Sequence, residues 1–399
     1  MDGRRPPAEP HARRRELRRR QVQRRRLVAL CLVSVVAAAI LALVLRGESS
    51  SATGSPDPGG TSGTQVSATA GESEAGTGTG EVDSPVRGRL GSGNPVTFAF
   101  GGDVHFESPI REQLLASPAS VFAPIAPALE AADVAMVNLE TAVTDRGEPA
   151  PKTYTFRAPA SAFDAIEMGG VDVVTLANNH GLDYGLTGMR DTLAAARRAG
   201  VPLVGAGRNA ARAYAPYRIT VDGQRIAIIG ATQVLDDHLI SEWTAGPGKP
   251  GLASAKEVDR LVRAVEQVRA TSDTVVVYVH WGVELDSCAT SDQRTLAARL
   301  VDAGADIVVG SHAHVLLGAG RLGKAFVAYG LGNFVFYASR EETSRSGVLE
   351  VTVTGRRIDG YRWIPARISN GIPHPLAGSE RAQARRAWNE LRGCTDLRR

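Results

Sequence analysis

The chain has 399 residues, and 43% of them are apolar, which is enough to build one large or two modest domains. Its net charge of +4 is unevenly spread: residues 1–46 carry twelve Arg against three acids, a local charge of +9, so the remainder is about −5. The basic character therefore lies in the N-terminus alone and does not indicate a nucleic-acid-binding domain, so we expect no nucleic-acid partner.

An uncharged, almost wholly apolar segment covers residues 27–45. A helix of about 19 residues spans roughly 30 Å of hydrocarbon, so this segment predicts one transmembrane helix. The Arg-rich tail at 1–26 should stay in the cytoplasm by the positive-inside rule, and this places the C-terminal domain of a single-pass cell-membrane protein outside. A cleaved signal peptide and a twin-arginine signal at Arg24-Arg25 are alternatives, and they too place the bulk of the chain outside.

Residues 46–94 are rich in Gly, Ser and Thr and have almost no large apolar side chains. Such a segment cannot bury a core, so we expect a disordered linker between the membrane helix and a folded domain. Of the three cysteines, Cys31 lies in the apolar segment, whereas Cys288 and Cys394 fall outside the membrane. An oxidising compartment and an even count favour a disulfide between these two, with two free thiols as the alternative.

From residue 95 onward, short apolar runs alternate with helical stretches, a pattern typical of an α/β domain. The sequence predicts strands at 96–100, 134–137, 171–176, 226–229, 274–279, 307–309 and 326–329. It predicts helices at 120–131, 161–168, 186–199, 255–270 and 291–303. The domain is expected to end in β-structure over 347–368, and a tail at 369–399 should carry a helix at 379–391.

Polar residues follow five of the predicted strands, and five of the eight histidines are among them. They are Asp103, His105, Asn138, Glu140, Asn178, Asn179, His180, His280, Glu284, His312 and His314. Carboxyl ends of parallel strands share one sheet edge, so these side chains should meet there. In His312-Ala313-His314, alternate residues of an extended segment would point the same way.

Imidazoles and carboxylates in this ratio suit Mn, Fe or Zn, and the absence of Cys from the set argues against a structural zinc site. The alternative is that each residue has a separate local role, such as a helix cap, a turn, or a core histidine.

In order and residue type, these motifs resemble the calcineurin-like metallophosphoesterases. Over about 95–368 the longer motifs resemble the capsule-synthesis protein CapA family; they are Gly102-Asp103, Val137-Asn138-Leu139-Glu140, Ala177-Asn178-Asn179-His180, His280-Trp281-Gly282-Val283-Glu284, Gly310-Ser311-His312-Ala313-His314-Val315 and Tyr329-Gly330-Leu331-Gly332-Asn333-Phe334. That family is linked to poly-γ-glutamate capsule synthesis and export. The resemblance implies a metallophosphoesterase-like αββα sandwich.

The resemblance also implies two divalent metal ions and a role for each site residue. One metal would be bound by Asp103, His105 and His314. The second would be bound by Asn179, His280 and His312. Glu140 would bridge them, where the phosphoesterases use Asp, and His180 would act as general acid or stabilise charge at the leaving oxygen. The supporting residues would be Asn138, which could share the bridging role, Asn178, Glu284 holding an imidazole, and Asn333 at the pocket rim. Asp183 is expected to cap the helix that begins near Leu186.

These expectations favour a membrane-anchored protein of envelope-polymer synthesis or export that works with other membrane proteins, because one span cannot form a polymer channel. Its substrate would be an anionic polymer. An alternative is a dinuclear-metal phosphoesterase at the outer membrane face, and a third is a non-catalytic polymer- or wall-binding module.

Overall fold

The computed structural model describes residues 91–399. The predicted cytoplasmic tail, the membrane span at 27–45 and most of the linker lie outside the described residues. Within 91–399, no helix combines the length and apolarity needed to cross a bilayer. Just before the first strand, the Asn94 side-chain amide donates to the Asp222 carbonyl at 2.9 Å.

The first of two large sheets is mixed. Its strands are β1 (Val96–Val104), β2 (Val134–Leu139), β5 (Val173–Thr175), β6 (Leu203–Val204), β15 (Asn333–Val335), β16 (Arg345–Thr354), β17 (Arg357–Ser369) and β18 (Ile372–Pro375). They follow the order β18-β17-β16-β1-β2-β5-β6, and β15 also pairs with β1. The β1, β2, β5 and β6 strands run parallel, whereas β16 is antiparallel to β1.

The second sheet contains β8 (Tyr217–Val221), β9 (Gln224–Thr232), β11 (Thr274–Trp281), β12 (Ile307–His312), β13 (Ala319–Leu322) and β14 (Ala325–Ala328). Its order is β13-β14-β12-β11-β9-β8, and the four strands β9, β11, β12 and β14 run parallel. Two small sheets pair β3 (Ala142–Val143) with β4 (Arg157–Ala158) and β7 (Ala206–Gly207) with β10 (Gly251–Leu252).

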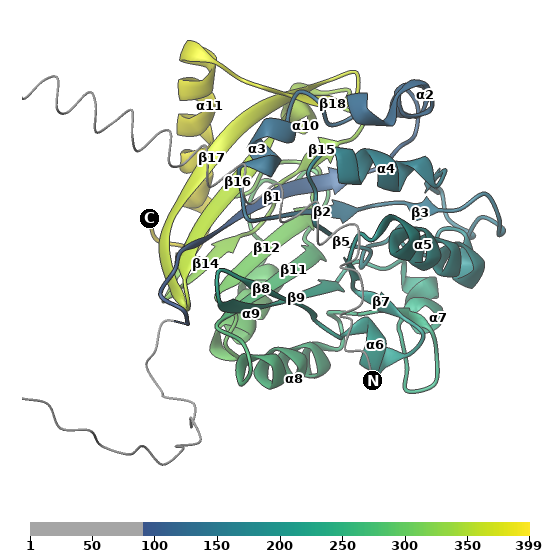
Figure 1. Cartoon of the computed structure of the whole chain (residues 1–399), viewed down its shortest axis with the longest axis horizontal. Helices are drawn as coiled ribbons and strands as arrows, with labels where there is room; N and C mark the ends of the chain where they lie inside the picture. The colour runs from purple at the N-terminus through teal and green to yellow at the C-terminus, as the bar shows by residue number, and fades with distance from the viewer. Residues whose placement is uncertain (1–90) are drawn as a thin grey trace, which may run out of the picture. The chain divides into compact units, whose positions relative to one another are not determined.

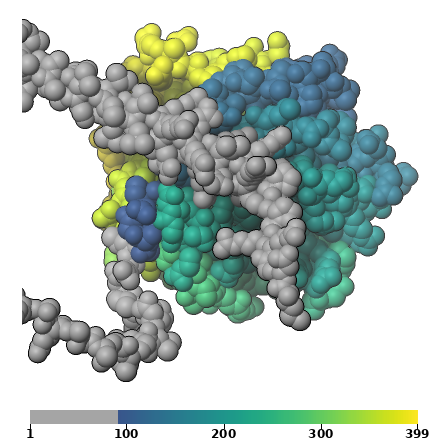
Figure 2. Space-filling view, in the orientation of Figure 1, coloured from purple at the N-terminus to yellow at the C-terminus, as the bar shows by residue number. Residues whose placement is uncertain are grey.

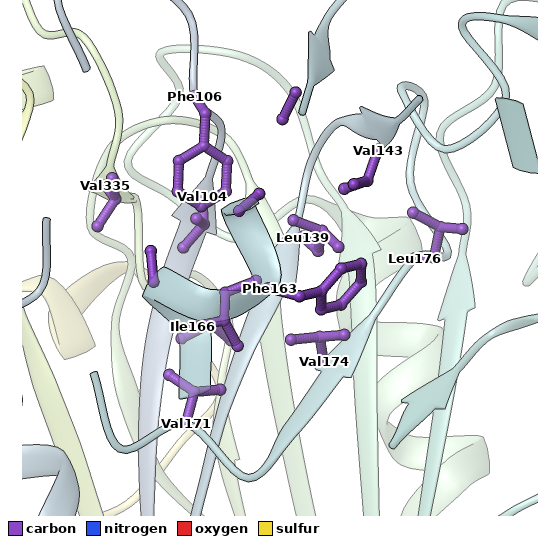
Figure 3. Close-up of a cluster of buried hydrophobic side chains, with 14 of the residues drawn as sticks. Val104, Phe106, Leu139, Val143, Phe163, Ile166, Val171, Val174, Leu176 and Val335 are labelled. Atoms are coloured by element: carbon purple, nitrogen blue, oxygen red, sulfur yellow. The ribbon is translucent and has the colours of Figure 1, made fainter. Parts of the chain in front are cut away.

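The two large sheets pack face to face, because apolar side chains from both of them form one buried cluster. Phe98 and Phe100 of β1 belong to it together with Tyr278 of β11 and Phe326 of β14. Helices α4 (Ser161–Met168) and α5 (Gly185–Ala199) cover the outer face of the first sheet, where Phe163 packs among strand side chains (Figures 1 and 3). Helices α8 (Val258–Arg269) and α9 (Ser291–Asp302) cover the second sheet. The layers are therefore α, β, β and α.

The prediction of a helix at 120–131 is the main one that is wrong. The structure has a 3-10 turn at Pro118–Ser120 and a short α3 (Ala126–Glu130) instead. Pro124 lies inside the predicted helix, and a proline there removes a backbone donor and disfavours helical geometry just before it. The remaining short helices, which the sequence did not predict, are α2 (Ile110–Ala116), α6 (Ala210–Ala213), α7 (Ile240–Trp243) and α10 (Glu341–Ser344).

The C-terminal segment is tied to the domain at several points. Helix α11 (Gly378–Glu390) places Trp388 in a stack on Trp363 of β17, with ring centroids 5.1 Å apart. Beyond it, Cys394 is bonded to Cys288, with a Cα–Cα distance of 5.4 Å. Just before β18, the Gly371 carbonyl accepts the backbone N–H of Phe336. On the surface, the C-terminal segment (yellow) borders the first segment of the domain (blue) (Figure 2). The disulfide therefore joins the C-terminus to the loop after β11.

Candidate metal centre

Strand register brings the polar strand ends together from both sheets. In the first sheet, Asp103 of β1 pairs with Asn138 of β2 on one side and with Asn333 of β15 on the other. In the second sheet, His280 of β11 lies beside Ser311 of β12. Gly102 permits the close approach of β15, because a Cβ there would lie 1.9 Å from the Gly332 carbonyl oxygen. The site thus lies where the carboxyl ends of the two facing sheets meet.

Three sets of side chains bring candidate ligand atoms within 4.8 Å of one another. The first is Asp103, Glu140 and His314; the second is Glu140, His280 and His312; the third is Glu284, His312 and His314. Glu140 belongs to the first two sets, which is the shared position expected of a bridging carboxylate. The exposed Glu284 approaches the histidine pair from the solvent side.

Glu140 provides the test of whether these residues fit a metal. Its Oε1 atom is fully buried and accepts no hydrogen bond within residues 91–399. The Nε2 atoms of His280, His314 and His180 lie 3.7, 3.9 and 4.0 Å from it. These separations are too long for hydrogen bonds, but they suit ligands that each sit about 2.0–2.2 Å from a shared ion. A buried carboxylate oxygen ringed by imidazoles therefore fits a divalent cation.

Two asparagines connect the ligands behind the site. The Asn138 amide donates to Asp103 Oδ1 at 2.8 Å and lies 3.2 Å from His280 Nδ1. Its own oxygen accepts from Asn178 at 2.8 Å, and the Asn178 oxygen in turn accepts the His180 backbone N–H at 2.9 Å. Such networks hold ligands in one orientation, so both asparagines occupy supporting positions.

Two further contacts orient individual imidazoles. His314 donates from Nδ1 to Asn333 Oδ1 at 2.8 Å, which leaves its Nε2 lone pair directed toward Glu140. His280 Nε2 lies 2.8 Å from Asn179 Oδ1, a spacing that two adjacent ligands of one ion can adopt. Asn333 thus positions a histidine, rather than only lining the rim.

The histidine pair does not adopt the extended geometry expected from its spacing. His312 and His314 have φ angles of 101° and 57°, so the chain turns at both residues. The two rings are 5.9 Å apart and tilted by 56°. Left-handed backbone is unfavourable for non-glycine residues, and such strain clusters at functional sites. The turn lets the His312 backbone N–H donate to Asp103 Oδ2 at 3.1 Å.

His180 has a partner that the sequence assigned to another role. Asp183 does not cap α5, because the N-cap residue is Tyr184 and no side chain caps the helix. Instead, the Oδ2 atom of Asp183 lies 2.6 Å from His180 Nδ1. Its Oδ1 is 3.2 Å from the buried Lys152 ammonium, which also lies 3.4 Å from Asp236. The three-residue spacing from His180 could have indicated Asp183, whereas Lys152 has no local sequence signal.

His105 lies outside the three ligand sets found in the described part of the chain. Its ring is enclosed by aromatic side chains: the centroids of Phe336, Tyr337 and Phe156 are 3.9, 4.6 and 4.9 Å away. Its Nδ1 is 2.9 Å from the Glu107 backbone nitrogen. The structure therefore brings together six of the seven expected ligands, counting Asn179 through its contact with His280, and places His105 in the wall beside them.

Burial of the side chains is the main cause of the pKa shifts in this site. It raises the pKa of Glu140 well above its usual value, and the nearby Asp103 adds to the rise. It raises the pKa of Asp183 to about 7, with Lys152 opposing the shift. It lowers the pKa of His180 and His280 well below their usual range. The imidazoles of His180 and His280 are therefore neutral at physiological pH, which is the form that binds metals.

His312 should make the metal-free protein sensitive to acid. Burial, assisted by the charge of His314, lowers the pKa of His312 to about 3. Because the unfolded chain binds the proton near pH 6.5, this group contributes stability above pH 6.5 that is lost as pH falls toward 3. We compare the two proteins in EDTA, between pH 7 and pH 5. The free energy of unfolding of wild type should fall by about 2 kcal/mol more than that of His312→Gln. Urea unfolding at both pH values measures this, and equal losses would contradict it.

Taken together, these features define an α/β protein with a buried candidate centre for divalent metals at the joint edge of its sheets. Residues 97–338 match the family described as bacterial capsule synthesis protein PGA_cap. The capsule biosynthesis protein CapA of Bacillus anthracis is 30% identical over 307 residues, covering 75% of this chain and 73% of that protein. The PGA biosynthesis protein CapA of Bacillus subtilis is 29% identical, covering 74% of this chain and 78% of that protein. The chain belongs to the bacterial capsule synthesis protein family, as the sequence motifs indicated.

Solved structures that resemble this chain share less sequence identity with it than the two Bacillus relatives do. The sulfate thiohydrolase SoxB of Thermus thermophilus is 13% identical with a TM-score of 0.41, covering 74% of this chain and 60% of that chain. A 5'-nucleotidase from Candida albicans is 10% identical with a TM-score of 0.40, covering 74% and 58% of the two chains.

Proposed function

We propose that this chain is a membrane-anchored protein acting in poly-γ-glutamate capsule or envelope-polymer synthesis or export. The role in capsule synthesis and the choice of poly-γ-glutamate are supported by the names of the two Bacillus relatives, a capsule biosynthesis protein and a PGA biosynthesis protein. The apolar segment at 27–45, with its preceding arginines, supports a single span with the domain outside. The Cys288–Cys394 disulfide supports an oxidising compartment. Neighbouring membrane proteins would supply the channel that one span cannot form.

The chemistry of the domain is proposed to depend on two divalent ions, Mn, Fe or Zn, in a metallophosphoesterase-type fold. The Glu140 Oε1 atom carries this proposal, because it is buried without a hydrogen bond among three imidazole nitrogens. Asp103, Glu140 and His314 would hold one ion, and Glu140, His280, His312 and Asn179 the other. When bound, such a pair lowers the pKa of a water and stabilises charge on the attacking and leaving oxygens of a hydrolysis.

A second candidate is hydrolysis of a phosphoester at the outer membrane face. The His180–Asp183 pair favours it over a purely binding role. Because Asp183 holds the Nδ1–H of His180, the free Nε2 atom faces the shared carboxylate and can accept a proton from water and return it to a leaving oxygen. A module that only bound a polymer would have no use for a positioned proton carrier.

Metal content of the purified full-length chain is the direct test. Wild type should contain about two equivalents of a transition metal, and Asp103→Ala/His312→Ala should contain almost none. Loaded protein would then be screened with aryl phosphoesters and with γ-glutamyl polymers, which separates the two candidate functions. If wild type took up no Mn, Fe or Zn on reconstitution, the dinuclear centre would be ruled out.

A further inference from the structure

Glu284 does not form the hydrogen bond to an imidazole that the sequence leads us to expect. Its carboxylate lies within 4.8 Å of the candidate ligand atoms of His312 and His314, yet no group of residues 91–399 donates a hydrogen bond to it. His312 Nδ1 is likewise buried without a hydrogen-bond partner in this part of the chain. Polar atoms that lie this close without hydrogen bonds are arranged as ligands around one ion would be.

The backbone holds Glu284 beside the histidine pair. The residue lies between Gly282 and Leu285, which have φ angles of 96° and 62°. The Leu285 backbone N–H donates to the carbonyl of Ala313 at 2.8 Å, and Ala313 is the residue between the two histidines. The Glu284 side chain is nevertheless exposed. It can therefore turn toward the ligand atoms or toward solvent while its backbone stays in place.

Negative charges meet at this point of the centre. After burial and Asp103, the charge of Glu284 also raises the pKa of Glu140. Lys152, the cation whose charge reaches Glu140, has a buried side chain and is already paired with two aspartates. Like charges at close range are unfavourable unless a cation lies between them. The position of Glu284 therefore fits a bound ion better than it fits the chain's own charges.

The hydrogen bonds of His314 show that Glu284 would share an ion already assigned. The Asn333 amide nitrogen donates to the Thr343 carbonyl at 3.0 Å, and the Asn333 oxygen accepts from His314 Nδ1 at 2.8 Å. Nδ1 thus carries the hydrogen, and only Nε2 has a lone pair for a metal. Because His314 also belongs to the set that contains Asp103, one ion would contact both that set and Glu284.

We propose that Glu284 is an additional, displaceable ligand of this metal centre, and that a carboxylate of the substrate exchanges with it. Glu284 occupies the solvent-side position in the free protein and turns into solvent when a substrate carboxylate takes its place. One carboxylate replaces another, so the net charge at the ions is unchanged. The inference rests on the proposed function and deepens it, because every residue of a γ-linked glutamate polymer carries a free α-carboxylate.

Anion binding to metal-loaded full-length protein tests the exchange without requiring turnover. Calorimetry gives the affinities for acetate and for γ-glutamylglutamate, which carries the carboxylates of the polymer. A ligand that must displace Glu284 binds more weakly, in proportion to the fraction of molecules in which the position is free. Glu284→Ala should therefore bind both probes at least about tenfold more tightly than wild type. Its metal content, measured on the same samples, should stay that of wild type.

A second variant separates ligand exchange from simple repulsion between anions. Glu284→Asp keeps the negative charge but is one methylene shorter, so its carboxylate should no longer reach the ion and both probes should again bind more tightly. Glu266→Ala, which removes an exposed carboxylate from α8, is the matched control and should bind both probes as wild type does.

Each other outcome overturns a definite part of the inference. Tighter binding in Glu284→Ala but not in Glu284→Asp would reduce the role of Glu284 to charge repulsion. Loss of metal in Glu284→Ala would make it a fixed ligand, and a gain for acetate without a gain for γ-glutamylglutamate would exclude the γ-glutamyl substrate. Wild type without metal would instead remove the proposed metal centre itself, and the inference with it.

Discussion

Glu140→Gln should abolish metal uptake and at the same time stabilise the metal-free protein. Loss of supporting partners alone typically weakens metal affinity 10–100-fold, so loss of the shared carboxylate should cost at least about 100-fold. Without metal, however, Glu140 is a buried carboxylate whose Oε1 atom accepts no hydrogen bond within residues 91–399. A neutral amide of the same size should relieve part of a penalty of about 1–3 kcal/mol.

Thermal unfolding with and without added metal measures both effects of Glu140→Gln. In EDTA the variant should unfold at a higher temperature than wild type, and added Mn or Zn should raise only the wild-type melting temperature. Glu266→Gln, on the exposed side of α8, is the matched control and should respond to metal as wild type does. A variant that still bound two ions with wild-type affinity would show that Glu140 is not the bridging ligand.

His180→Ala should lower turnover by about 10²–10⁴-fold while the metal content stays near two equivalents. His180 belongs to none of the three ligand sets in the described residues, and its Nε2 atom lies 4.0 Å from Glu140 Oε1. Proton transfer would therefore be lost without loss of the ions. Turnover of an aryl phosphoester and metal analysis on the same samples measure the two quantities.

Two companion variants separate proton transfer from a structural effect. Asp183→Asn keeps the imidazole but weakens the contact that holds its Nδ1–H, so it should reduce turnover less than His180→Ala and shift the pH profile. His374→Ala, at an exposed histidine of β18, should leave turnover unchanged. If His180→Ala kept wild-type turnover, His180 would have no role in proton transfer and would only pack against Phe156.

The sequence predicted where along the chain the main strands lie and which residue types serve as candidate ligands, because both are local signals. Apolar runs mark β1, β2, β9, β11 and β12, and polar residues follow most of them directly in the chain. Proline content could have corrected the helix at 120–131, since Pro124 acts on its immediate neighbours. The pairing of Asp103 with Asn333 depends instead on strand register across 230 positions of the chain, which no local pattern encodes.

The sequence by itself determined which side chains are available to the site, the family to which the chain belongs, and the apolar and basic segments of its N-terminus. Tertiary structure alone decided which of these side chains meet. It divided the strand ends between two facing sheets, turned the chain at His312 and His314, directed Asp183 to His180 rather than to a helix cap, and set His105 in an aromatic wall. The physical reason is that ligand geometry depends on packing between segments far apart in the chain, whereas periodicity and composition report only on each segment's own neighbours.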